Sequence, residues 1–99
     1  MPFVRVGEFR TKEGTADEVA RIYEGEAIPA IRGLSGNLTA LLLRQHEQPD
    51  RFLAITIWRT SADAEAYDKS GLAQEMASKI RHAFAGPPTL TTYEVYGIG

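Results

Sequence analysis

The chain has 99 residues, the length of one domain with one hydrophobic core. It carries 11 Lys and Arg against 13 Asp and Glu, and this net charge of −2 argues against a nucleic-acid binder and a polybasic membrane patch. The absence of cysteine excludes disulfides, thiolate metal sites and a cysteine nucleophile. The longest apolar run, about 38–43, is far shorter than the ~20 residues that cross a bilayer, and the N-terminus lacks a signal-peptide pattern. We therefore expect a soluble, cytoplasmic protein.

The first part of the chain predicts a strand followed by a long helix. Residues Phe3–Arg10 alternate, with apolar side chains on both faces, which is typical of a strand. After a turn, Thr15 and Glu18 have the spacing of a capping box at a helix N-terminus. Apolar residues at helical spacing then predict a helix over Ala16–Arg32. Because Pro29 lies inside this segment and lacks a backbone donor, we expect the helix to bend.

The second part of the chain predicts a hairpin, two short helices and a last strand. Asn37–Gln45 and Arg51–Arg59 flank a polar turn that contains a proline, which favours an antiparallel hairpin. Thr60 or Ser61 caps the next helix, since acidic residues fill its first turn. The remaining predicted elements are the end of that helix near Lys69-Ser70-Gly71, a helix over Leu72–Phe84 and a strand over Leu90–Tyr96.

The order of these elements predicts the fold class. A β-α-β-β-α-β order, with the second helical segment in two parts, is typical of the α+β, ferredoxin-like arrangement, in which helices cover one face of a four-stranded antiparallel sheet. We expect the other face to carry the aromatic residues Phe3, Phe9, Phe52, Trp58 and Tyr96. Because this is too much apolar surface for a monomer, we expect a homodimer in which two sheets pack face to face.

Several short segments follow one another along the chain in a characteristic order: Lys12-Glu13-Gly14, Ile28-Pro29-Ala30-Ile31-Arg32, Leu34-Ser35-Gly36, Ile55-Thr56-Ile57-Trp58, Ala66-Tyr67-Asp68-Lys69-Ser70, Gly86-Pro87-Pro88 and Tyr93-Glu94-Val95. In this order and spacing, the chain resembles the antibiotic biosynthesis monooxygenase (ABM) domain family of the dimeric α+β barrel superfamily. The resemblance implies one such domain over residues 1–99, a dimeric α/β barrel, and a pocket between each sheet and its helices. It also implies activities that range from cofactor-free oxygenation of anthrones and quinols to haem degradation.

The haem-degrading branch of that family can be compared residue by residue. It uses an Asn on the first strand, a Trp in the short helix and a His on the next helix, and these positions fall on Gly7, Tyr67 and Ala77 here. Because haem iron needs an axial ligand, the missing His disfavours haem degradation. His82 lies off the apolar stripe, and no pair of histidines has metal-ligand spacing. We expect no metal and no cofactor.

Three side chains are candidates for chemistry. The resemblance places Tyr67 in the pocket, where its phenol could hydrogen-bond a substrate hydroxyl or enolate, although it could also simply pack on the sheet. Glu26 falls near the centre of the apolar helix face, where a buried carboxylate would suit a general base. The alternative is that the bend lets it reach solvent or an arginine. Arg5 could hold an anionic oxygen or pair with Glu94 across the sheet.

The resemblance further implies that Gly7, Thr56, Trp58 and Ala77 line the pocket. A packing role for Trp58 is the alternative, and its N–H will need a partner if it is buried. The function expected is that of a small cofactor-independent monooxygenase acting on a quinol- or anthrone-like aromatic. Two other functions stay open, because one fold hosts many chemistries. They are a non-catalytic, small-ligand-binding or stress-associated barrel protein, and an isomerase or lyase with Glu26 as the base.

Overall fold

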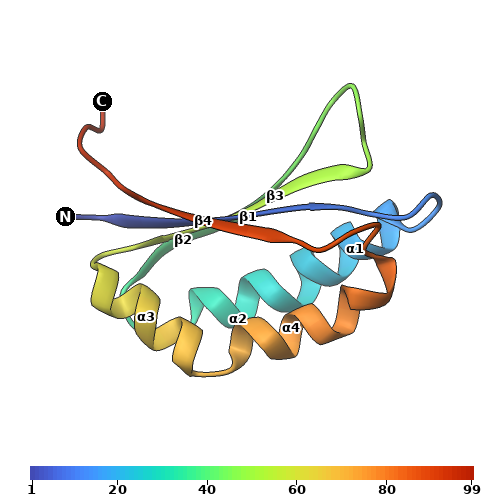
Figure 1. Cartoon of the computed structure of the whole chain (residues 1–99). Helices are drawn as coiled ribbons and strands as arrows, with labels where there is room; N and C mark the ends of the chain where they lie inside the picture. Colours follow the sequence, from blue (N-terminus) through green and yellow to red (C-terminus); the bar gives the residue numbers. More distant parts are fainter.

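The computed structural model describes all residues from Met1 to Gly99, and its centre is one antiparallel sheet. The strands are β1 (Phe3–Arg10), β2 (Asn37–Arg44), β3 (Arg51–Trp58) and β4 (Thr89–Glu94), in the spatial order β2-β3-β1-β4. The two neighbours of β1 are thus the third and fourth strands of the chain. All helices lie on one side of this sheet (Figure 1), so the predicted α+β, ferredoxin-like class is confirmed.

The first helical segment contains a wide, π-helical turn in the region where a bend is predicted. It consists of α1 (Ala16–Ile22), the π-helix η1 (Tyr23–Ala27) and α2 (Ile28–Arg32). The Ile28 N–H donates to the carbonyl of Tyr23, five residues back, and the next residue is the proline that has no N–H to donate. Such π-turns inside α-helices occur frequently at functional sites.

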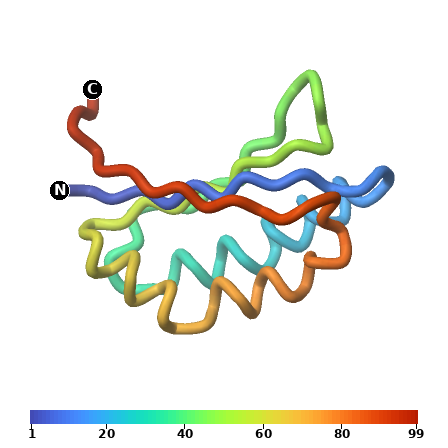
Figure 2. Tube along the Cα trace, viewed as in Figure 1, coloured from blue at the N-terminus to red at the C-terminus, as the bar shows by residue number.

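The second helical segment also consists of several pieces. They are α3 (Ser61–Lys69), α4 (Leu72–Ile80) and the single 3₁₀ turn η2 (Arg81–Ala83). The helix predicted over Leu72–Phe84 is therefore shorter in its α-helical part than expected. In the Cα trace of Figure 2, α4 runs beside the first helical segment under the sheet, in agreement with their contacts. None of the helices has the length and apolar character needed to cross a bilayer.

One predicted helix cap is confirmed and the other is wrong. The Thr60 hydroxyl accepts from the Asp63 backbone N–H at 3.2 Å, as expected for the start of α3. Thr15 makes no such bond, because its hydroxyl donates instead to the Lys12 carbonyl at 2.7 Å. Its predicted capping partner Glu18 pairs with a histidine of η2, so no capping box forms.

A glycine allows the turn before β2 to approach α3, which carries one of the candidate residues. Gly36 has a backbone φ angle of 81°, a value that residues with a side chain rarely adopt. A Cβ atom at this position would collide with the Asp63 side chain in the first turn of α3. The close approach of this turn to α3 therefore requires glycine.

The aromatic residues lie on the opposite face of the sheet from the one predicted. Phe9, Phe52 and Trp58 are buried beneath the helices, and the Phe9 and Phe52 rings stack at 5.2 Å. Phe3 packs against the same covered side, and Tyr96 lies beyond β4, with 83% of its surface exposed. Alternation shows that two faces differ, but both are apolar here, and the larger rings fill the space under the helices.

The face that the helices leave uncovered is aliphatic. Alternate residues of a strand point to opposite sides, so the neighbours of the buried residues point away from the helices. The strand register aligns them across the sheet, with Val4 opposite Ile57 and Val6 opposite Ile55. We call the following set the apolar outer face: Val4, Val6, Leu41, Leu43, Leu53, Ile55 and Ile57. The sheet therefore does have an apolar face that the helices leave uncovered, but this face consists of aliphatic residues and not of the predicted aromatic ones.

Candidate functional site

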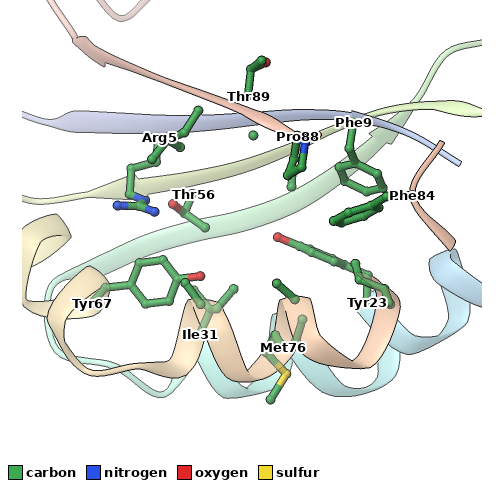
Figure 3. Close-up of a pocket in the computed structure, with 17 residues that line it drawn as sticks. Arg5, Phe9, Tyr23, Ile31, Thr56, Tyr67, Met76, Phe84, Pro88 and Thr89 are labelled. Carbon is green, nitrogen blue, oxygen red and sulfur yellow. The ribbon is translucent and has the colours of Figure 1, made fainter. Parts of the chain in front are cut away.

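A cavity of about 230 Å³ lies between the sheet and the helices. Seventeen residues line it, of which 12 are hydrophobic, and Figure 3 shows the main ones. The two hydrophobic clusters of the core meet here, since Phe9 and Ile80 belong to one of them and Ile31 and Tyr67 to the other. Arg5 is the only charged residue in the lining. A mostly apolar cavity with a few polar groups is the usual form of a small-ligand site.

Arg5 is a cation held on the covered side of the sheet, with only 14% of its side chain exposed. Its guanidinium lies 5.2 Å from the centre of the Tyr67 ring, within cation–π range. Its Nη1 atom is 3.2 Å from a carboxylate oxygen of Asp68, half of whose side chain is exposed. The predicted pair with Glu94 is wrong, because Glu94 lies opposite Phe3 in the sheet, and Arg5 reaches down to α3 instead.

Tyr67 lies between Arg5 and the core. Its ring stacks on Trp58, with ring centres 4.9 Å apart. Trp58 is fully buried and does not line the cavity, although Tyr67 does. The Trp58 N–H donates to the Thr56 hydroxyl at 2.8 Å, which provides the partner that a buried indole needs. Trp58 therefore packs behind the site and supports the ring of Tyr67.

Tyr23 is a pocket residue that the sequence reasoning missed. Helical spacing places Tyr23 on the apolar face of the first helix, and it does lie on the core side, but this pattern alone did not make it a candidate for ligand contact. Figure 3 shows the hydroxyls of Tyr23 and Tyr67 pointing toward one another from opposite walls. Neither hydroxyl forms a hydrogen bond within the protein. The available signal was a tyrosine among aliphatic residues, beside a proline-induced bend.

Burial controls the ionisation of both phenols. Loss of water raises the pKa of Tyr23 well above its usual value, repulsion by Tyr67 adds to this increase, and Arg5 opposes it. Burial likewise raises the pKa of Tyr67, and the nearby Arg5 guanidinium partly offsets the effect. Both phenols are therefore neutral near pH 7, where they can donate hydrogen bonds but do not act as bases.

Glu26 lies outside the cavity, so its predicted position on the buried helix face is wrong. Its carboxylate is 2.6 Å from the Lys79 ammonium of α4, and 49% of its side chain is exposed. The π-turn accounts for the difference, because it directs Tyr23 and Ala27 toward the cavity and leaves Glu26 between α4 and solvent. The alternative expectation, that the bend lets Glu26 reach solvent and a cation, describes this geometry, with a lysine in place of an arginine.

The positions compared with the haem-degrading branch do lie at the cavity. Gly7, Tyr67 and Ala77 all line it, as does Thr56, and none of them is a histidine. His82 is exposed on η2 and lies 3.4 Å from Glu18. The cavity therefore contains no imidazole to hold haem iron. Nor does any group of three or more His, Asp or Glu side chains have a geometry that could hold a metal ion.

Comparison with known proteins identifies the family. The model of the antibiotic biosynthesis monooxygenase (ABM) family matches residues 2–79, and the chain belongs to this family. Among curated proteins there is no match.

Solved structures share the fold at low sequence identity. A protein from Nitrosomonas europaea, described as a proposed antibiotic biosynthesis monooxygenase, is 19% identical with a TM-score of 0.82, over 99% of this chain and 94% of that chain. One from Deinococcus radiodurans with the same description is 18% identical with a TM-score of 0.82, over 97% and 94%. A conserved protein from Methanosarcina mazei is 12% identical with a TM-score of 0.84, over 94% and 91%. At these identities the likeness establishes the fold alone.

The raised pKa values predict how stability changes in alkali. An unfolded tyrosine loses its proton near pH 10, whereas folded Tyr23 and Tyr67 keep theirs to higher pH. The unfolded state thus binds fewer protons, and the free energy of unfolding falls as pH rises above about 10. Each phenol contributes up to about 1.4 kcal/mol per pH unit to this fall. The free energy of unfolding, measured with urea between about pH 9 and 11, should fall less steeply with pH for Tyr23→Phe than for the unsubstituted protein. An identical pH dependence would contradict the buried, neutral phenol.

Proposed function

We propose that this protein is a cofactor-independent monooxygenase that acts on a small quinol- or anthrone-like aromatic. The observation that carries the proposal is the Arg5 guanidinium, mostly buried at the wall of an otherwise apolar cavity. A flat ring system fits among side chains such as Phe9, Ile31 and Phe84, with an oxygen directed at Arg5 and Tyr67. Family membership supports the reaction class.

In this reaction the substrate reacts with O₂ directly, and the protein only has to stabilise and orient the substrate anion. The substrate hydroxyl or its tautomer loses a proton to water. Arg5 stabilises the resulting anion, and the low-dielectric surroundings strengthen this attraction. The electron-rich anion gives one electron to O₂, and the two radicals combine to form a carbon–oxygen bond. Loss of water from the resulting peroxide leaves a carbonyl, so one oxygen atom enters the substrate and the other leaves as water. The cavity supplies orientation and exclusion of solvent.

A non-catalytic ligand-binding protein is the second candidate. The lining of the cavity contains no carboxylate and no imidazole, and this observation favours binding over proton abstraction by the protein. The isomerase or lyase alternative required Glu26 as a base, and the position of this residue at the surface gives that alternative no support.

Oxygen uptake by purified, metal-free protein tests the oxygenase directly. With a panel of anthrones and quinols, we expect uptake well above the spontaneous rate. Tyr67→Phe should lower kcat/KM about tenfold by removing one hydrogen bond to a charged oxygen. Arg5→Met should lower it about 100-fold, as for loss of a preorganised charge partner. Arg59→Met, at an exposed cation, is the matched control.

The possible outcomes separate the candidates. No uptake with any member of the panel would favour the ligand-binding protein. Uptake that is unchanged in both Tyr67→Phe and Arg5→Met would keep the activity and contradict this site.

We further propose that two copies pair through the apolar outer face, which would bury the aliphatic side chains that the helices leave uncovered. Light scattering at micromolar concentration should give twice the 10.9 kDa mass of one chain. Ile55→Lys, at the centre of this face, should give the single mass, since a lysine there would have to be desolvated. A single mass for the unsubstituted protein would contradict the pairing.

A further inference from the structure

The polar side chains of the cavity wall can all donate a hydrogen bond to a ligand, and none of them is an anion. Arg5 has only N–H groups to offer, and the phenols of Tyr23 and Tyr67 are neutral. The Thr56 hydroxyl accepts from Trp58 and keeps its own hydrogen to donate. A wall of this kind complements a ligand oxygen that accepts several hydrogen bonds.

Tyr23 and Tyr67 come from separate elements, yet their hydroxyls converge. Tyr23 lies on η1 and Tyr67 on α3, and the two hydroxyls face one another across the cavity (Figure 3). Arg5 lies 5.2 Å from the centre of the Tyr67 ring, and it lines the same cavity as Tyr23. Since neither has a partner within the protein, both are available to a bound molecule.

We propose that Tyr23 is a second ligand-binding hydroxyl, which with Tyr67 donates to one ionised oxygen of the ligand beside Arg5, so that the site selects flat apolar molecules in their phenolate or enolate form. This deepens the proposed function by naming the form of the substrate that is bound. It also accounts for the absence of a base from the wall, because the site takes up the ionised molecule and stabilises it.

The energetics favour the anion over the neutral molecule. Hydrogen bonds to an ionised oxygen are about twice as strong as those between neutral groups. The carboxylate that balances Arg5 lies at the solvent side, with Asp68 half exposed, whereas the guanidinium borders the cavity. An oxygen within the cavity is therefore closer to the positive partner of this pair. The three groups of the pocket that act on the oxygen are Arg5, Tyr23 and Tyr67.

The test uses a probe that cannot be oxidised further, 2-hydroxyanthraquinone, whose visible absorption changes when its hydroxyl ionises. Binding to the unsubstituted protein should shift the apparent pKa of the probe downward. Tyr23→Phe should weaken binding of the anion about tenfold, as for loss of one hydrogen bond to a charge. Tyr67→Phe should have a similar effect. Tyr96→Phe, at an exposed hydroxyl beyond β4, should bind like the unsubstituted protein.

A second ligand guards against a folding defect in the variants. 2-Methoxyanthraquinone has the same rings but cannot ionise, and it should bind the unsubstituted protein and Tyr23→Phe with equal affinity. Equal binding of the ionised probe by these two proteins would overturn the proposal, as would failure of the unsubstituted protein to bind it or to lower its pKa. The probe reports binding without turnover. An absence of oxygenase activity would therefore contradict the proposed function without contradicting this proposal.

Discussion

A cation on the covered face of the sheet is the constraint around which this protein is built. A charge removed from water is costly unless other groups compensate it. Arg5 is compensated by the ring of Tyr67 and the carboxylate of Asp68, both from α3. The Tyr67 ring in turn stacks on Trp58, whose N–H is satisfied by Thr56 on the same strand. A continuous set of contacts thus links the charge to the hydrophobic core, and it fixes α3 relative to the sheet.

The opposite wall of the cavity depends on the backbone of the first helical segment. Pro29 interrupts the regular pattern of helix donors, and the π-turn η1 precedes it. This turn directs Tyr23 into the cavity and leaves Glu26 to pair with Lys79 at the surface. The result is an apolar space in which all the available polar groups can donate hydrogen bonds. Such a site suits a flat molecule with an electron-rich oxygen, and this is the type of substrate that an oxygenase without a cofactor requires.

The sequence was sufficient for the fold class and for part of the cavity lining. Periodicity and turn residues predicted the elements, and the resemblance placed Gly7, Thr56, Tyr67 and Ala77 at the pocket they do line. It could not decide which face the helices cover, because both faces of the sheet are apolar. A helical wheel of constant pitch places Tyr23 on the core side, where it lies, but it misplaces Glu26, because the π-turn brings this residue beside Lys79 at the surface. The partner of Arg5 was missed because Asp68 is far away in sequence and on another element.

Arg5 is a fixed charge at the cavity wall, and side-chain NMR relaxation measures this directly. The order parameter of the Arg5 Nε–H group should approach the value of rigid backbone, about 0.85, because the Tyr67 ring and the Asp68 carboxylate hold the guanidinium. The exposed Arg59 provides the internal reference and should fall below about 0.6. An Arg5 order parameter as low as that of Arg59 would mean that the guanidinium is not held at the cavity, and would contradict the account.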